Sequence, residues 1–182
     1  MSGRRDEFER LVLLHERRIY NVALKLTGDE DEAAELTQET FVRAYKAWGR
    51  FRGEAATYTW LYRILVNLNK DRISAIAKQR ERETSLTPTE DLEGQHELPD
   101  PSADVAGALE QADFQARLRQ AILDLPEGYR ECVVLKAMEG LSYQEIADAM
   151  GITVEAVRSR LARARQHLRQ ALESYLSAGN GN

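Results

Sequence analysis

Residues 141–169 constrain the fold of this chain more than any other part of its sequence. Ser142 followed by Glu145 forms a capping box, which opens a short helix. Gly151 suits the positive φ of a tight turn, and Thr153 can cap the helix that follows. A short helix, a glycine turn and a longer helix in this order predict a helix-turn-helix, which reads DNA with its second helix.

A helical wheel divides that second helix into an apolar side and an arginine-bearing side. The apolar stripe is Val154, Val157, Leu161, Leu168 and Leu172. The opposite side carries Ser159, Arg160, Arg163 and Gln166, flanked by Arg158 and Arg165. Glu155 is the one acid near these arginines, whereas a merely solvated face would mix charges of both signs. The pattern favours a recognition helix that reaches phosphates and base edges.

The charge of the whole chain limits how it can bind DNA. The net charge is -5, and residues 73–111 hold 3 basic and 9 acidic side chains. This acidic balance argues against a protein that coats nucleic acid non-specifically. We expect DNA binding in one particular pose, and weak binding by unaided electrostatics.

The composition predicts a cytoplasmic protein without chemistry of its own. Cys132 is the single cysteine, which excludes an internal disulfide, and its apolar neighbours indicate a buried side chain. A reducing cytoplasm is therefore expected. No apolar run approaches the roughly 18 residues that span a bilayer, so no membrane insertion is expected. The three histidines lie outside any metal-ligand spacing, and no nucleophile or phosphate-loop motif is present, so we expect no metal, cofactor or enzyme activity.

Helical periodicity is present in the N-terminal and C-terminal parts of the chain and is absent from the segment between them. We expect three helices in the N-terminal part of the chain. The first covers about 8–26, the second begins at an Asp29–Glu32 capping box and ends at about Trp48, and the third covers about 57–78. Residues 79–104 contain three of the four prolines and many acids, as in a linker that cannot fold alone. Helices resume near Val105, break around residues 125–127, and continue to Gly140. We predict an all-α fold: two small helical domains at 1–78 and 107–176, joined by a flexible acidic linker at 79–106.

Two polar surfaces stand out in the first domain. The helix over 57–78 places Trp60 beside Arg63, Asn67, Lys70 and Ser74, opposite a core stripe. That core stripe is Tyr58, Leu61, Ile64, Leu65 and Leu68. An exposed tryptophan of this kind can stack on unpaired bases, which contributes about 1–3 kcal/mol per base. Alternatively, Trp60 packs beneath the loop at Phe51 or against a neighbouring helix. The preceding helix carries a charged face with Glu39 and Arg43 at i,i+4 spacing, which a self-supporting solvated face explains.

Two long segments carry a resemblance to a known family. They read DEAAELTQETFVRAYKAWGRFRGEAATYTWLYRILVNLNKD, at 31–71, and LPEGYRECVVLKAMEGLSYQEIADAMGITVEAVRSRLARAR, at 125–165. Together with the acidic linker between them, they resemble the extracytoplasmic-function sigma factors, the smallest class of the bacterial sigma-70 family. The resemblance implies that the first domain is sigma region 2, that the second is region 4, and that the chain acts as a subunit of RNA polymerase holoenzyme.

The same resemblance implies three sets of contact residues. Docking on the β′ clamp of core polymerase would use Asp31, Glu35, Leu36, Gln38, Glu39, Phe41 and Tyr45. The separated strand of the downstream promoter element would meet Phe51, Arg52, Gly53, Ala55, Ala56, Tyr58, Trp60, Arg63 and Asn67. The duplex of the upstream element would meet Thr153, Arg158, Ser159, Ala162 and Arg163.

Further partners follow from the resemblance alone. Region 4 would contact the β flap, and the acidic linker would run through polymerase toward the RNA exit path. An anti-sigma factor usually holds this class inactive. Two other functions stay open from the residues: a free-standing helix-turn-helix regulator that binds duplex as a dimer, and a sigma-like decoy that sequesters an anti-sigma factor and does not need its arginines.

Overall fold

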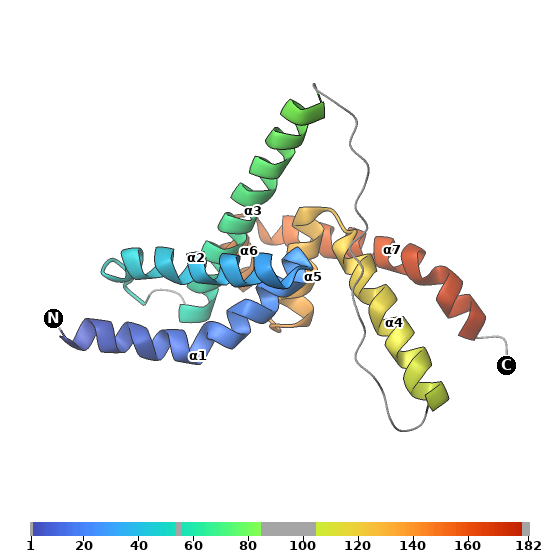
Figure 1. Cartoon of the computed structure of the whole chain (residues 1–182), viewed down its shortest axis with the longest axis horizontal. Helices are drawn as coiled ribbons and strands as arrows, with labels where there is room; N and C mark the ends of the chain where they lie inside the picture. Colours follow the sequence, from blue (N-terminus) through green and yellow to red (C-terminus); the bar gives the residue numbers. More distant parts are fainter. Residues whose placement is uncertain (1, 54–55, 85–104, 180–182) are drawn as a thin grey trace.

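The computed structural model describes residues 2–53, 56–84 and 105–179. These residues form seven α-helices and no β-strand. Figure 1 shows how the helices are arranged. The expected all-α class is therefore confirmed for the part of the chain that the structure describes. Most of the expected linker lies outside it.

Three helices form the first domain: α1 (Ser2–Thr27), α2 (Glu30–Trp48) and α3 (Thr57–Thr84). α1 and α2 run side by side in opposite directions, and α3 crosses them before projecting from the body (Figure 1). Their shared core includes Phe8, Ile19, Val22, Leu26, Leu36, Phe41, Leu61 and Leu65. α3 continues six residues beyond the predicted end at Lys78.

The junction between α1 and α2 follows the sequence signals only in part. Gly28 adopts φ +75° and ends α1, as its freedom from a Cβ allows. Asp29 caps α2 by accepting a 2.9 Å hydrogen bond from the backbone N–H of Glu32. The reciprocal half of the expected box is absent, because the Glu32 carboxylate pairs with Arg72 of α3 and the Asp29 N–H donates to Thr27 Oγ1.

Four helices form the second domain: α4 (Val105–Leu123), α5 (Glu127–Ala137), α6 (Tyr143–Met150) and α7 (Val154–Gly179). The predicted helix-turn-helix is confirmed. Ser142 and Glu145 make both capping-box bonds, and Gly151 adopts φ +65° between α6 and α7. Thr153 Oγ1 accepts a 3.1 Å hydrogen bond from the Ala156 N–H.

The turn before α6 differs from the sequence expectation. α5 ends at Ala137 instead of continuing to Gly140, which adopts φ +64° outside the helix. The Lys136 ammonium donates to the Leu141 carbonyl oxygen at 3.0 Å and stabilises this turn. As a result, Glu139 lies in a loop and is free to point toward the first domain.

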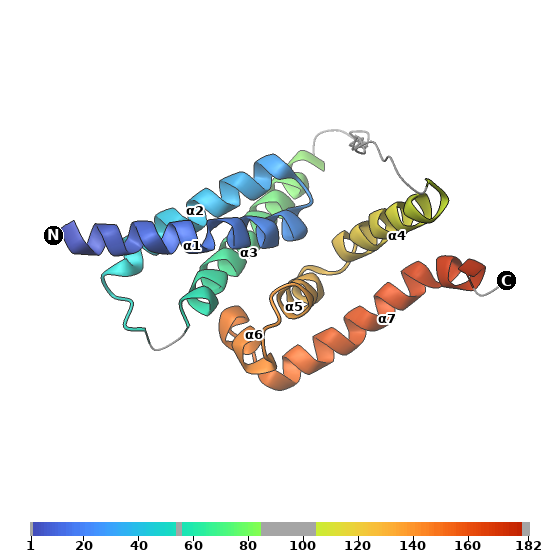
Figure 2. The same cartoon turned by 90° about the horizontal axis from the view of Figure 1, so that it is seen from below.

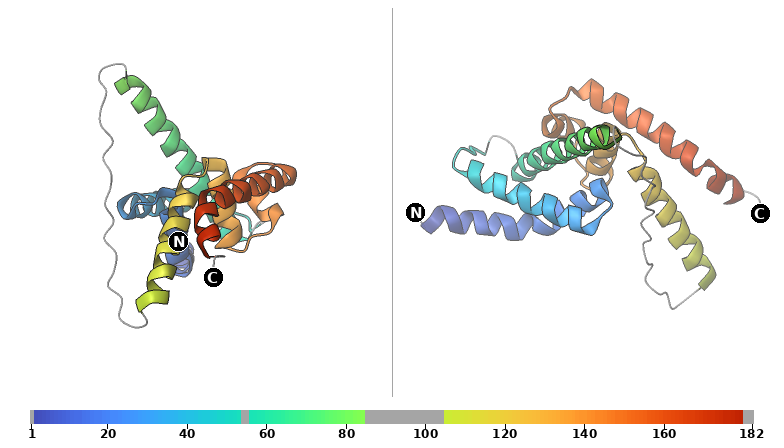
Figure 3. Two further views of the ribbon diagram at one scale, coloured as in Figure 1. Left: turned by 90° about the vertical axis from the view of Figure 1, so that its right-hand side faces the viewer. Right: turned by 45° about the horizontal axis from the view of Figure 1, so that its top comes forward.

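The two domains pack directly against each other, which the sequence did not indicate. α3 contacts α6, and α1 contacts both α4 and α5. Figures 2 and 3 show α6 placed against the beginning of α3, with α7 on the outer side. Buried residues of both domains join in one continuous cluster.

Candidate nucleic-acid interface

The outer face of α7 presents the residues expected at duplex DNA. Thr153, Arg158, Ser159, Ala162 and Arg163 are all exposed. On the inner face Val157, Leu161, Ala164 and Leu172 are buried against the rest of the second domain. The apolar stripe therefore fixes the pose of the helix and leaves its outer side chains accessible, as recognition of a groove requires.

Arg160 is an exception to the predicted arginine face. Its side chain is half-buried and lies along α5, so close that a Cβ added to Gly128 would stand 2.7 Å from its Nη1 atom. It also exerts an electrostatic pull on the buried Glu131. Because α5 packs against this side of α7, Arg160 belongs to the packing of the domain and not to its outer face.

The aromatic residues at the start of α3 form a stacked group. The Trp60 ring lies 4.5 Å from the Phe51 ring, and Phe51 lies 5.5 Å from Trp48, measured between ring centroids. Trp60 is half-buried in this group, which matches the alternative that it packs against the Phe51 loop. A role for its remaining exposed edge in DNA binding stays a prediction.

The other downstream residues lie in three environments. Arg63 and Asn67 are exposed on α3, and Arg52, Gly53 and Ala56 are exposed in the loop before it. Ala55 lies outside the described residues. Tyr58 faces the second domain instead of solvent: its hydroxyl donates a 2.5 Å hydrogen bond to Glu145 Oε1. That bond and partial burial raise the pKa of Tyr58.

The expected docking face on α2 divides into exposed and buried residues. Asp31, Glu35, Gln38, Glu39 and Tyr45 are exposed, and Glu39 pairs with Arg43 at 3.0 Å. Leu36 and Phe41 are at most 9% exposed, so they hold α2 against the core.

A groove of about 700 Å³ runs between α2 and α1. Its lining is Phe8, Val12, Glu16, Arg17, Tyr20, Ala34, Thr37, Gln38, Phe41, Val42, Tyr45 and Lys46. Three of the predicted docking residues, Gln38, Phe41 and Tyr45, border it. Sequence reasoning missed the α1 half of the groove because it assigned the apolar residues of α1 to the core. A signal was present in the sequence, since Val12 and Tyr20 add apolar positions on α1 beside the stripe that packs into the core.

Glu131, a buried acid that sequence reasoning did not single out, lies near the domain boundary beside Cys132. Glu131 is fully buried, and neither of its carboxylate oxygens accepts a hydrogen bond from the described residues. Burial raises its pKa to about 7, against the opposing pull of Lys70 and Arg160. The neighbouring Cys132 is buried as expected, and burial raises its pKa to about 11, so it is a poor thiolate source.

Comparison with known proteins identifies the family. Residues 11–80 match the family described as Sigma-70 region 2, and residues 115–168 match Sigma-70, region 4. The chain is 38% identical over 177 residues to the RNA polymerase sigma-H factor of Pseudomonas aeruginosa, covering 96% of this chain and 90% of that protein. It is 32% identical over 171 residues to the ECF RNA polymerase sigma factor SigW of Bacillus subtilis, covering 94% and 91%.

This chain is an extracytoplasmic-function sigma factor of the sigma-70 family. Its fold is similar to that of CnrH, solved in complex with the cytosolic domain of CnrY, with a TM-score of 0.65, 27% identity and coverage of 95% of this chain and 92% of that one. The sigma factor RpoE of Bartonella quintana, in complex with the anti-sigma factor NepR, shares the fold at a TM-score of 0.67, 23% identity and coverage of 92% and 97%. These comparisons do not favour a free-standing regulator or a decoy.

Two features are absent from the residues that the structure describes. No helix among them combines the length and apolar character that a bilayer crossing requires. In the same part of the chain, no cluster of three histidine, cysteine, aspartate or glutamate side chains is placed to hold a metal ion.

Proposed function

We propose that this sigma factor docks on core RNA polymerase through the outer face of α2 and the groove beside it. The exposed acids Glu35 and Glu39 supply charge, and Tyr45, which is 55% exposed, supplies apolar contact. The groove supplies a concave apolar surface for a partner helix. The chain would work in the cytoplasm as a subunit of the holoenzyme, with the catalytic chemistry left to polymerase.

Promoter recognition would then use two surfaces on two domains. The observation that carries this proposal is the outer face of α7, where Arg158, Ser159 and Arg163 are exposed on a helix fixed by its buried stripe. This face would read the duplex of the upstream element. Arg63 and Asn67 on α3 would hold the separated strand of the downstream element, close to the aromatic group of Trp48, Phe51 and Trp60.

An anti-sigma factor is a further proposed partner. The support is the likeness to CnrH, which was solved with the cytosolic domain of CnrY. A binding protein that covers the α1–α2 groove would exclude polymerase from it.

In vitro transcription with purified core polymerase and a promoter library tests the proposal. We expect specific transcripts with the sigma factor, and poor binding of promoter duplex by the chain alone, because its net charge is -5. A variant with both Arg158→Ala and Arg163→Ala should lose promoter selection but keep core binding. Arg169→Ala is the matched control, since it removes an exposed arginine from the later part of α7.

Two results would contradict the proposal. Tight, specific duplex binding by a dimer of the free chain would favour a self-sufficient regulator. Unchanged transcription from the double arginine variant would remove α7 from promoter reading.

A further inference from the structure

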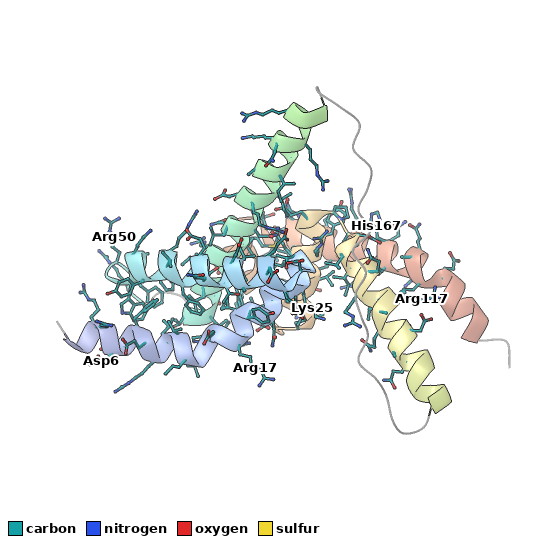
Figure 4. All side chains as sticks on the ribbon, viewed as in Figure 1. Asp6, Arg17, Lys25, Arg50, Arg117 and His167 are labelled. Atoms are coloured by element: carbon teal, nitrogen blue, oxygen red, sulfur yellow. The ribbon has the colours of Figure 1, made fainter. Side chains whose placement is uncertain are left out.

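The first turn of α5 lies against the side of α7 that carries Arg160, Arg163 and His167. These three residues share one side of the helix, because they are spaced three and four positions apart. Tyr129, in the first turn of α5, contacts two of them. Its hydroxyl accepts a 3.5 Å hydrogen bond from Arg163 Nη1, and its ring centroid lies 5.9 Å from that of His167. Figure 4 shows His167 on α7, beside the place where α4 leads into α5.

The position of Tyr129 is fixed by its own helix and by the packing of that helix. Its backbone N–H donates to the Pro126 carbonyl oxygen at 2.9 Å, which closes the first turn of α5. The preceding residue, Gly128, lies so close to α7 that an added Cβ would stand 2.7 Å from Nη1 of Arg160. The Tyr129 ring is half-buried and has only two rotatable bonds. Its hydroxyl is therefore held at one place beside α7.

The Arg163 side chain gains order from this contact. It is exposed, and an exposed arginine samples many rotamers that binding must restrict. A bond that already restricts the side chain in the free protein lowers that cost. The bond to Tyr129 uses one of the five guanidinium N–H donors, so enough donors remain to contact O6 and N7 of a guanine. At 3.5 Å the bond is long, which leaves the guanidinium able to adjust to a base.

We propose that Tyr129 is a positioning residue for promoter reading, whose hydroxyl holds the Arg163 guanidinium toward a guanine of the upstream element. This rests on the proposed function, in which the outer face of α7 reads that element. Tyr129 acts through Arg163, so its effect is discrimination between base pairs at one position. The two residues are 34 positions apart and lie on different helices, so the helical pattern of α7 does not show this pairing.

A direct bond from Tyr129 to a DNA phosphate is the alternative. Such a bond would strengthen binding to every promoter alike, because phosphates carry no sequence information. A positioning residue instead changes the preference for one base pair, and its effect requires Arg163. The two cases therefore differ in which promoters are affected and in whether loss of Arg163 removes the effect.

Promoter competition by holoenzyme distinguishes these cases. Core polymerase is assembled with wild type, Tyr129→Phe, Arg163→Ala or the double variant, and promoters that differ at single base pairs of the upstream element compete for it. We expect Tyr129→Phe to lower discrimination about twofold to fivefold at the position that Arg163 reads, as the loss of one weak hydrogen bond allows. In the Arg163→Ala background it should have no further effect. Tyr143→Phe removes a hydroxyl from α6 of the same domain and is the matched control, which should keep wild-type discrimination.

NMR of the free chain measures the contact without DNA. The heteronuclear NOE of the Arg163 Nε–H group reports how restricted the side chain is, and Arg163→Lys identifies its signal. We expect a lower NOE in Tyr129→Phe than in wild type, with the exposed Arg169 unchanged as an internal control. The thermal unfolding midpoint should stay the same, because phenylalanine keeps the ring that contacts His167.

Three outcomes would count against these conclusions. Unchanged discrimination in Tyr129→Phe, when Arg163→Ala loses it, overturns the proposal. Equal weakening at all promoters that persists in the Arg163→Ala background also overturns it and assigns Tyr129 to a phosphate. Wild-type discrimination in Arg163→Ala would instead contradict the proposed function of α7, and the NMR measurement would still decide whether Tyr129 orders Arg163.

Discussion

The hydroxyl of Tyr58 donates a 2.5 Å hydrogen bond to Oε1 of Glu145, which is 87 residues further along the chain. The other carboxylate oxygen of Glu145 holds the capping box of α6. The first turn of the helix-turn-helix and the beginning of α3 therefore share one acceptor. A substitution that removes the bond of this carboxylate to either helix should therefore also alter the stability of the other helix.

A double-mutant cycle with Tyr58→Phe and Glu145→Ala measures this coupling. We expect an interaction of about 1–2 kcal/mol in the free energy of unfolding, because the bond joins a phenol to a charged carboxylate. The bond from Tyr58 and those from Ser142 lower the pKa of Glu145 below 4.5. The stabilisation is therefore present above that pH and is lost as the pH falls through the lowered pKa. If the two substitutions change the free energy of unfolding in urea additively, the hydrogen bond contributes nothing to stability, which would contradict the prediction.

Glu131 predicts a pH dependence of opposite sign. Its pKa is raised from 4.5 to about 7, so the folded chain holds a proton between these values that the unfolded chain releases. The free energy of unfolding should fall as the pH rises from 4.5 to about 7 and then level off. Glu131→Gln should flatten this slope and stabilise the protein at pH 8 by about 1–3 kcal/mol.

Urea unfolding at pH values from 5 to 8 measures this pH dependence of stability. Glu173→Gln, at an exposed position, is the control. The carboxyl of Glu131 faces Lys70 of α3, Glu127 of α5 and Arg160 of α7, so these charges should be retained in every variant. Parallel curves for wild type and Glu131→Gln would contradict the prediction.

Arginines on α7 should separate into two kinds. Arg163→Ala should cost about 1–3 kcal/mol of promoter affinity if the side chain reads a base, with little loss of stability. Arg160→Ala should instead lower the unfolding midpoint, because its half-buried side chain packs along α5 beside Gly128. Thermal unfolding and binding to single-base promoter variants distinguish the two. A large loss of base discrimination in Arg160→Ala, at unchanged stability, would place that residue back on the outer face.

Trp60→Ala should destabilise the first domain by about 1–3 kcal/mol, since it removes a half-buried ring stacked on Phe51. Trp60→Phe should recover most of that loss. Asn67→Ala, at an exposed position on α3, should leave stability unchanged and reduce strand opening. Permanganate footprinting of unpaired thymines in holoenzyme, together with thermal unfolding, checks both. Normal stability of Trp60→Ala would show that the stacking contributes nothing to the fold.

Local sequence signals predicted those features that depend on a few neighbouring residues. Gly28, Gly151 and the Ser142–Glu145 box mark chain reversals and helix starts, and all three behave as expected. Helical periodicity separated Val157 and Leu161, which are buried, from Arg158 and Arg163, which are exposed. The family resemblance is confirmed, while the roles assigned to individual residues stay predictions.

The sequence alone determined that the helices exist, the capping box of α6 and the family, because these depend on contacts within a few residues or within one helix face. Only the tertiary structure decided the burial and the partners of Tyr62, Glu131 and Glu139. Tyr62 lies outside the predicted core stripe of its own helix, yet it is fully buried because the second domain covers it. Glu131 and Glu139 read as ordinary surface acids until the domains pack, since burial and a partner on another element, not the local sequence, set the environment of a carboxylate.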